Sequence, residues 1–313
     1  MDTIAVVLNA PERLSLSRID LTPPTEEDVV VDIEWSGIST GTERLLYTGR
    51  MPSFPGLGYP LVPGYESVGR ISQVGARAGL RPGQRVFVPG AKCYGEIRGL
   101  FGGAASRLVV PAARVIPIDD TLGEQGVLLA LAATAYHAVA APGAALPDLV
   151  IGHGVLGRLV ARVVVALGGS PVVWERNKDR MAGADGYTVL EPDADLRRDY
   201  RSIIDVSGDS AILDSLIARL APGGEVVLAG FYSQPLSFAF PPAFMREARL
   251  RIAAEWREPD LRATKELVEA GRLSLDGLIT HRRDATQAET AYKTAFGDPA
   301  CLKMVLDWRG VQA

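Results

Sequence analysis

Residues 1–120 carry their hydrophobic side chains in short runs that Gly and Pro residues separate. Examples of these runs are IAVVL, DVVVDIEW, SVGRISQVG, QRVFVPG and RLVVPAARVIPI. Short runs rich in Val and Ile that end in turn residues are typical of β-strands. The pattern therefore predicts an all-β module in this part of the chain.

The pattern changes after residue 120. Residues 123–141 resemble an Ala- and Leu-rich helix, and the chain then alternates between strand-like and helix-like segments. In order, these segments are LVIGHG, VLGRLVARVVVALG, PVVWE, SIIDVS, AILDSLIARL and GEVVLAG. Strands that alternate with helices favour a doubly wound parallel sheet, so we expect an α/β domain over residues 121–258. The tail, residues 259–313, holds two helical stretches around a short LITHR strand, and we expect it to complete the first module.

Composition narrows the class of protein. The 313 residues include 33 basic and 37 acidic side chains, for a net charge of −4, which disfavours a partner with a phosphate backbone such as nucleic acid. No apolar run is long enough and uncharged enough to cross a bilayer, and the N-terminal segment is not typical of a signal peptide. Cys93 and Cys301 belong to no CxxC pair, which argues against a disulfide framework or a cysteine-built zinc site. We expect a cytoplasmic protein.

One motif carries the chemistry of the α/β domain. The segment DLVIGHGVLG places Gly152, Gly154 and Gly157 in a GxGxxG spacing between a predicted strand and a predicted helix. The first Gly permits a tight turn, the second lets a pyrophosphate approach the backbone, and the third packs helix against strand. The helix N-terminus adds N–H donors and the positive end of a dipole. We therefore predict a dinucleotide site, whose other turn residues are His153, Val155 and Leu156.

An acidic residue follows the next predicted strand. Glu175 comes about 20 residues after the glycine turn, where an acidic side chain accepts hydrogen bonds from the adenosine ribose. A carboxylate there repels the 2′-phosphate of NADP, so NAD is the favoured cofactor, although the adjacent Arg176 softens this repulsion. We set aside the alternative, a glycine turn that holds no nucleotide, because the strand, the glycine spacing and the helix start are all present.

A β module, a dinucleotide motif and a closing tail together resemble the medium-chain dehydrogenase/reductase superfamily, which implies a GroES-like catalytic domain and a Rossmann domain. The matching stretches are SGISTGTE, PGYESVG, RPGQRV, TAY and GHGVLG. Zinc-dependent members carry a Cys ligand where this chain has Ser39 or Thr40, and a His followed by Glu where it has Tyr65 and Glu66. Their third ligand is commonly a Cys near the position of Ala130. A catalytic Zn²⁺ needs three such ligands, so we predict no catalytic metal and, with Cys93 alone in its loop, no structural metal.

Without a metal, another group must take the proton of an alcohol. The available groups are Tyr65, Glu66, Ser39, Thr40, Glu43 and His137. Tyr65 is the first candidate because it stands at a ligand position, and packing over the cofactor is the competing interpretation. We favour a structural role for the Glu66 carboxylate and for His137. For His153 we expect a position beside the phosphates or the solvent.

One subfamily shares these departures from the zinc pattern, namely the 3-hydroxyethyl bacteriochlorophyllide a dehydrogenases. The resemblance rests on SGISTGTE, FPGLGYPLVPGYE, IRGLFGGA, LAATAYHA, IGHGVLGRL, LAGFYS, EARLRIAAEW, LSLDGLITHR and DPACLKMVLDW. It implies NAD-dependent oxidation of the 3-(1-hydroxyethyl) group of a chlorin or bacteriochlorin to 3-acetyl, in bacteriochlorophyll biosynthesis, by a homodimer. We hypothesise that the conjugated macrocycle delocalises the positive charge that develops at the carbinol carbon, which reduces the need for a Lewis acid.

The resemblance also implies site residues. The positions at which superfamily members line the cofactor are Thr134, Ser207, Gly230, Phe231, Tyr232 and, near the pyrophosphate, Lys303. A macrocycle needs a wide apolar cleft, normally between domains. Candidate wall residues are Phe54, Leu57, Tyr59, Tyr94, Phe101, Phe231, Tyr232 and Trp256, although core packing is the favoured interpretation for each taken singly. Candidates for the propionate carboxylate of the substrate are Arg98 and Lys92, although a solvated surface role is favoured for both. Two alternatives stay open: a zinc-free quinone or alkene reductase of the superfamily, and a nucleotide-binding protein without catalysis.

Overall fold

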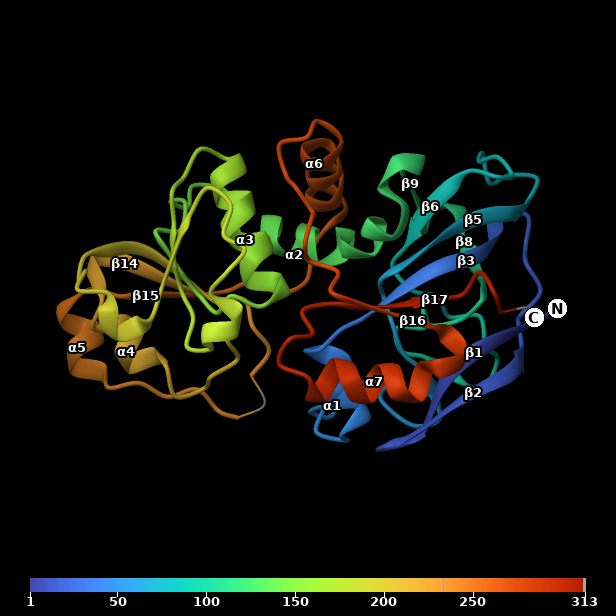
Figure 1. Ribbon diagram of the computed structural model, residues 1–313, viewed down its shortest axis with the longest axis horizontal. Helices are drawn as coiled ribbons and strands as arrows, with labels where there is room; N and C mark the ends of the chain where they lie inside the picture. The colour runs from blue at the N-terminus through green and yellow to red at the C-terminus, as the bar shows by residue number, and fades with distance from the viewer. Residues whose placement is uncertain (233, 312–313) are drawn as a thin grey trace. The chain divides into compact units, whose positions relative to one another are not determined.

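The structure is a computed structural model that describes residues 1–232 and 234–311. The chain forms two compact units. Unit 1 comprises Met1–Ala130 and the described residues from Asp276 onward, and unit 2 comprises Leu131–Leu275. Figure 1 labels many of their helices and strands. Every helix among the described residues is too short or too polar to span a bilayer.

Two β-sheets form unit 1 (Figure 1). One is four-stranded with the order β2-β1-β4-β7, and the other is seven-stranded with the order β16-β17-β3-β5-β6-β9 and β8 paired to β3. The strands of the first are β1 Asp2–Ala10, β2 Arg13–Asp20, β4 Leu61–Val62 and β7 Arg98–Gly99. Those of the second are β3 Asp28–Ile38, β5 Ser67–Val74, β6 Arg85–Val88, β8 Arg107–Pro111, β9 Ile116–Pro117, β16 His281–Asp284 and β17 Met304–Asp307. The helices are α1 Thr42–Tyr47, η1 Ala112–Arg114, η2 Asp120–Leu128, η5 Ala285–Gln287 and α7 Ala288–Gly297.

The strand β3 lies at the centre of the larger sheet because its side chains are apolar on both faces. Val29, Val30 and Val31 are consecutive and fully buried, and successive side chains of a strand point to opposite faces. The strand pairs with β5 along one edge, and with β8 and β17 along the other. Since β17 comes from the tail, segments from both ends of the chain share this core.

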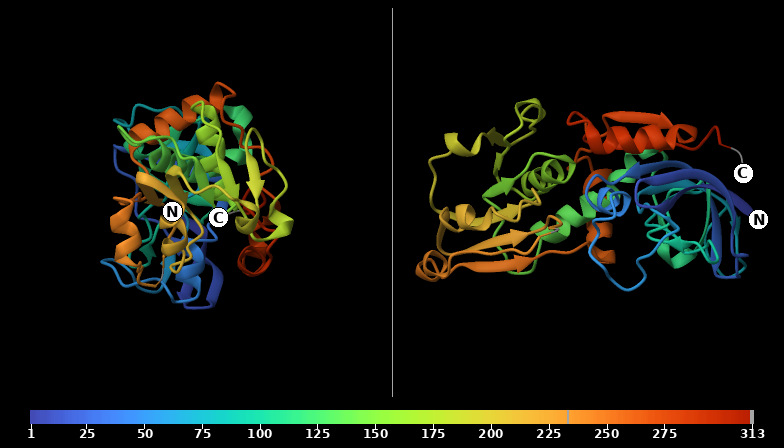
Figure 2. Two further views of the ribbon diagram at one scale, coloured as in Figure 1. Left: turned by 90° about the vertical axis from the view of Figure 1, so that its left-hand side faces the viewer. Right: turned by 90° about the horizontal axis from the view of Figure 1, so that it is seen from below.

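A six-stranded parallel sheet forms unit 2, with the order β12-β11-β10-β13-β14-β15. Its strands are β10 Leu149–Ile151, β11 Val172–Trp174, β12 Thr188–Leu190, β13 Tyr200–Asp205, β14 Leu220–Leu228 and β15 Arg249–Ile252. The helices are α2 Leu129–Val139, α3 Val155–Ala166, η3 Lys178–Arg180, η4 Pro192–Ala194, α4 Leu213–Ile217, α5 Phe240–Met245 and α6 Glu258–Glu269. The helix α3 packs against β10. Figure 2 shows the ribbon from two further sides. Strand order reverses between β10 and β13, the point at which doubly wound sheets bind ligands.

These sheets confirm the predicted fold class, whereas the predicted boundaries differ from those of the units. The chain passes from one unit to the other after Ala130 and after Leu275, whereas the sequence predicted boundaries after residues 120 and 258. The helix α6 therefore belongs to unit 2, not to the module that the tail completes. The physical reason is an anchor at the helix start, where Asp260 accepts from His137 of α2 at 2.8 Å, together with burial of Leu261 and Leu267.

Candidate active site

The glycine turn follows β10 and leads into α3. Gly152 has a φ of +97°, which favours glycine because a Cβ strains that backbone region. A Cβ on Gly157 would lie 1.8 Å from the carbonyl oxygen of Gly152, so this position needs glycine for the close approach of helix and turn. A Cβ on Gly154 would meet no protein atom within 4 Å. The space in front of Gly154 is therefore open to a ligand, and the α3 N-terminus begins at the next residue.

The Glu175 carboxylate is fixed at the end of β11 by backbone donors. The N–H of His153 donates to Oε2 at 2.9 Å, and the N–H of Asn177 donates to Oε1 at 2.8 Å. The carboxylate is thereby tied to the glycine turn, while each oxygen keeps a lone pair for a further donor. Arg176, beside it, is exposed.

The prediction for the His153 side chain is wrong, because the imidazole lies in the interior rather than beside phosphates or solvent. It is fully buried, with Nδ1 at 2.6 Å from the carbonyl oxygen of Arg180 and Nε2 at 2.8 Å from the Tyr187 hydroxyl. Burial lowers the pKa of His153 to about 4, so the ring is neutral. A carbonyl only accepts, so Nδ1 donates to Arg180 and Nε2 accepts from Tyr187. The buried His153 ring therefore anchors the glycine turn to Arg180 and Tyr187 in the interior of unit 2.

The predicted cofactor residues after β13 and β14 gather around a residue that sequence reasoning missed. Asp205 ends β13 fully buried, and its carboxylate accepts the Ser207 N–H at 2.9 Å and the Tyr232 hydroxyl at 2.5 Å. The N–H of Gly230 donates to the Asp205 carbonyl at 3.1 Å, and Phe231 is half exposed. Burial raises the pKa of Asp205. An Asp at a strand end next to the order reversal was the available signal.

Two hydroxyls meet in unit 1 at the positions where zinc enzymes carry ligands. The Tyr65 phenol donates to Ser39 Oγ at 2.7 Å, and the ring of Phe101 packs edge-on to Tyr65 with centroids 5.3 Å apart. Burial and the nearby Glu66 charge raise the pKa of Tyr65 well above its usual range, while hydrogen bonds to Ser39 and Thr42 oppose the shift. Tyr65 is therefore a neutral donor rather than a phenolate base. Thr42 was missed in the sequence, and Thr40 is half-buried beside the pair.

A buried ion pair lies in the same unit. Glu66 Oε2 and Lys303 Nζ are 2.6 Å apart, both side chains are fully buried, and Nζ also donates to the Ile38 carbonyl at 3.2 Å. A Cβ on Gly37 would lie 2.2 Å from Glu66 Oε2, so the pair needs glycine there. Lys303 thus points to Glu66, not toward a pyrophosphate, which corrects the expectation for this residue. Glu66 Oε1 is buried without a hydrogen-bond partner.

These residues do not fit a zinc ion. Among residues 1–232 and 234–311, no three His, Cys, Asp or Glu side chains lie close enough together to hold a metal. Ser39 and Tyr65 offer neutral hydroxyls, and the Glu66 carboxylate is engaged by an ammonium group. Zinc in proteins prefers thiolate, imidazole and carboxylate ligands, so we assign no step of the reaction to a metal.

Known proteins resemble this chain in sequence and in fold. Residues 25–120 match the family model for the alcohol dehydrogenase GroES-like domain. The curated 2-desacetyl-2-hydroxyethyl bacteriochlorophyllide A dehydrogenases of Cereibacter sphaeroides and Rhodobacter capsulatus are each 58% identical to this chain, and each match covers 99% of both sequences. The chain belongs to this bacteriochlorophyllide dehydrogenase family. The solved structure of 2R,3R-butanediol dehydrogenase from Bacillus subtilis has the same fold, with a TM-score of 0.85, 20% identity, and coverage of 97% of this chain and 99% of that one.

Membership of the bacteriochlorophyllide dehydrogenase family confirms the resemblance inferred from the sequence, and the predicted classes of fold and enzyme with it. The candidate wall residues divide into two groups. Tyr94 is a core residue, since it is buried and donates to the Gly102 carbonyl at 2.6 Å, so the prediction for it is wrong. Tyr59 donates to the Leu46 carbonyl, and Leu57 packs beside it against the buried Leu46. Residues with exposed surface are Phe54, Leu57, Tyr59, Phe101 and, in unit 2, Trp256.

The remaining predicted residues lie outside these clusters. The His137 ring holds the start of α6 through its hydrogen bond to Asp260. This contact supports the structural role that the sequence favoured for His137. Thr134 is half-buried on α2. Lys92 and Arg98 are exposed in unit 1, and a Cβ on Gly58 would lie 2.9 Å from Arg98 Cζ. The Arg98 guanidinium therefore lies against the loop that carries Phe54, Leu57 and Tyr59.

Proposed function

We propose that this chain oxidises the 3-(1-hydroxyethyl) group of a chlorophyllide or bacteriochlorophyllide to 3-acetyl, with NAD and without catalytic zinc, in bacteriochlorophyll biosynthesis. The carrying observation is the 58% identity to a dehydrogenase of that name over 99% of the chain. The paired hydroxyls of Tyr65 and Ser39 support it, because they supply hydrogen bonding to an alcohol at the positions that hold a metal in zinc enzymes.

The glycine turn and Glu175 are the residues that would hold the cofactor. The open face of Gly154 and the N–H groups at the start of α3 suit a pyrophosphate, and the braced Glu175 carboxylate suits two ribose hydroxyls. A 2′-phosphate at the ribose would meet this carboxylate, which favours NAD over NADP. When bound, the nicotinamide ring accepts the hydride.

Proton transfer falls to the hydroxyl pair. The substrate O–H donates to the Tyr65 oxygen, the Tyr65 proton moves along its existing hydrogen bond to Ser39 Oγ, and the Ser39 proton passes to solvent water. Each hydroxyl accepts one proton and gives one up, so Tyr65 never has to ionise, in keeping with its raised pKa. The carbinol C–H leaves as hydride, the C–O bond becomes a carbonyl, and the macrocycle delocalises the positive charge that develops.

Arg98 and the loop beside it suit the rest of the substrate. Leu57, Tyr59 and Leu100 present partly exposed apolar surface, and the Arg98 guanidinium lies at its edge. Arg98 begins β7, three residues before Phe101, a distance of at most about 11 Å along the chain. We propose that the guanidinium binds the propionate carboxylate while the macrocycle rests on the apolar surface.

The edge of the unit 2 sheet supports a homodimer. The strand β15 is the last strand in the sheet order, and Leu250 and Ile252 on it are 40% and 69% exposed. An exposed apolar edge strand is a ready template for a second strand, and two copies of one edge pair self-complementarily about a twofold axis. We propose pairing through β15 in a cytoplasmic enzyme, with Ile252→Lys expected to yield monomers by light scattering.

The direct test is absorption spectroscopy with the chelator-treated protein, NAD and a 3-hydroxyethyl chlorin. We expect the long-wavelength band to shift as the conjugated ketone forms, at a rate that added zinc leaves unchanged. An unchanged spectrum with intact NAD binding contradicts the proposal, and restoration by zinc contradicts its metal-free part. Parallel titrations should show tighter binding of NADH than of NADPH. The reverse order would favour a quinone or alkene reductase.

A further inference from the structure

Glu43 is a fully buried carboxylate on the first turn of α1, and it clamps Ser39. The Ser39 N–H donates to Oε1 at 3.0 Å, and the Glu43 N–H donates back to the Ser39 carbonyl at 3.2 Å. The side chain held in this way is the one that accepts the Tyr65 hydroxyl at 2.7 Å. Glu43 therefore controls where Ser39 Oγ lies without touching that oxygen.

The other oxygen of Glu43 is held from the far end of the chain. Tyr292 of α7 donates its hydroxyl to Oε2 at 2.6 Å, and the two side chains are buried. The Tyr292 ring packs against Tyr47 and Phe296, with centroid separations of 6.5 and 5.6 Å. This packing fixes the hydroxyl, so α7 supports the carboxylate and the carboxylate supports Ser39.

We propose that Glu43, held by Tyr292, is a positioning residue for the reaction: its ionised carboxylate fixes Ser39 so that the Ser39–Tyr65 pair receives the substrate proton. This inference rests on the proposed function. Two donors already point their hydrogens at Glu43, which is the arrangement that a carboxylate accepts. Protonation would remove the charge that attracts these two donors and would place a third hydrogen beside them, which weakens their hold on the carboxyl group.

Glu43 changes protonation near neutral pH. Burial, together with the nearby Glu66 charge, raises the pKa of Glu43 from 4.5 to about 7, although the Tyr292 and Ser39 hydrogen bonds and the Lys303 charge oppose the shift. The groups that face it are thus Tyr292 from α7, Ser39, Glu66 and Lys303. Tyr65 stays neutral beside them.

The first test compares Glu43→Gln with the wild-type protein across pH. The amide keeps the shape, accepts from Ser39 and donates to the Tyr292 oxygen, but it carries no charge. We expect kcat at pH 8.5 to fall by about ten- to a hundredfold, with KM and NADH affinity unchanged. Because low pH protonates Glu43 in the wild-type protein, the ratio of the two kcat values should approach unity near pH 5.5. A purely structural role would give a ratio independent of pH.

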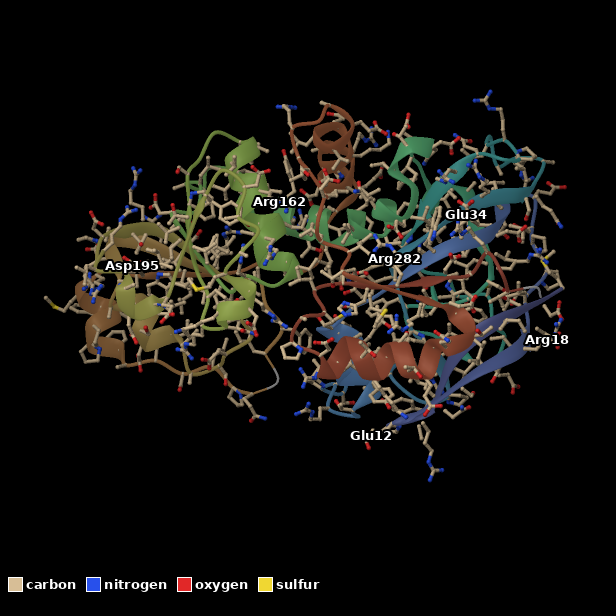
Figure 3. The ribbon with its side chains drawn as sticks, in the orientation of Figure 1. Glu12, Arg18, Glu34, Arg162, Asp195 and Arg282 are labelled. Carbon is tan, nitrogen blue, oxygen red and sulfur yellow. The ribbon has the colours of Figure 1, made fainter. Side chains whose placement is uncertain are left out.

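A matched control is Glu34→Gln in the same unit. Glu34, labelled in Figure 3, pairs with Arg70 and Arg85 on the seven-stranded sheet and lies outside the site. This variant should follow the wild-type pH profile. A Glu43→Gln protein with wild-type kcat at pH 8.5, or with a constant ratio across pH, overturns the proposal.

The second test is Tyr292→Phe, which keeps the ring packing and remains informative if Glu43→Gln fails to fold. Loss of the hydroxyl removes a hydrogen bond that lowers the pKa of Glu43, so the acid limb of kcat should move to higher pH. An unmoved limb overturns the assignment of that limb to Glu43.

A stability measurement separates this inference from the proposed function. Between the unfolded pKa of 4.5 and the folded pKa of about 7, the folded state binds more protons, so Glu43 makes the free energy of unfolding decrease as pH rises through that window. Glu43→Gln should remove this decrease. Absence of turnover by the wild-type protein would overturn the proposed function, whereas turnover with a pH-independent ratio would overturn only the role of Glu43.

Discussion

The glycine turn of unit 2 and a buried cluster of unit 1 are assembled in opposite ways. The cluster comprises Ser39, Glu43, Tyr65, Glu66, Tyr292 and Lys303. The turn is a single stretch, Gly152–Gly157, whose shape follows from its own backbone. The cluster joins residues from distant segments, including Glu66 and Lys303, which are 237 positions apart. The glycines set the backbone of the turn, which His153 and Glu175 also hold from neighbouring segments, whereas the cluster depends on charges that have no access to water. We therefore expect a substitution in the turn to affect only its own position. A substitution in the cluster should disturb several of its residues at once.

The largest effect is expected from breaking the buried ion pair. Lys303→Met leaves the Glu66 carboxylate buried without its ammonium partner, and such a change costs about 3–5 kcal/mol of stability in chemical denaturation. The double variant Lys303→Met, Glu66→Gln should recover part of this loss because no charge is stranded.

Arg282→Ala is the matched control for that experiment. Arg282, labelled in Figure 3, pairs with Glu124 at the surface of the same unit, with side-chain exposures of 54% and 26%. Exposed pairs contribute about 0–1 kcal/mol, so little change is expected. A Lys303→Met protein as stable as this control would contradict the view that the cluster depends on buried charge.

Removal of a hydroxyl should affect chemistry rather than cofactor affinity. Tyr65→Phe keeps the ring contact with Phe101 but deletes the hydroxyl that we propose as proton carrier, so kcat should fall by about 100-fold or more. Ser39→Ala should have a similar effect, and the double variant should be little worse, because the two groups act as one unit. Stopped-flow kinetics measures the rate of the chemical step, and NADH fluorescence titration measures the cofactor affinity. Additive losses would show that the two hydroxyls act separately.

Two glycines of the turn should separate stability from binding. Gly157→Ala places a Cβ against the Gly152 carbonyl and should cost about 1–3 kcal/mol in stability. Gly154→Ala meets no protein atom and should melt like the wild type, while it weakens NADH binding by about tenfold or more because the Cβ occupies the phosphate space. Calorimetry measures the stability of the two variants, and titration with NADH measures their affinity for the cofactor. Wild-type affinity in Gly154→Ala would rule out a pyrophosphate at this position.

The smallest effect is expected at the edge of the apolar surface in unit 1. Arg98→Ala should raise KM for the free-acid substrate by about tenfold, the size of a charged hydrogen bond, and leave the propionate methyl ester unaffected. Arg114→Ala, an exposed arginine on η1, is the control and should change neither value. Equal KM changes for acid and ester would disprove recognition of the carboxylate by Arg98.

Much of the fold follows from local pattern. The buried run of β3 and the strand–glycine–helix motif are local features, and each was predicted from adjacent residues. The assignment of α6 could not be, because its anchor, Asp260, meets His137 of α2 only in the folded unit. The buried orientation of the His153 side chain likewise depends on Arg180 and Tyr187, which are distant from His153 in the sequence.

The sequence by itself determined the parallel sheet, the nucleotide turn and the loss of zinc ligands, because backbone conformation and ligand chemistry are properties of the residues at those positions. Only the tertiary structure decided the partners of the buried charges. Glu66 meets Lys303, and Glu43 meets Tyr292, because burial makes an uncompensated charge costly, and the compensating group can come from anywhere in the chain.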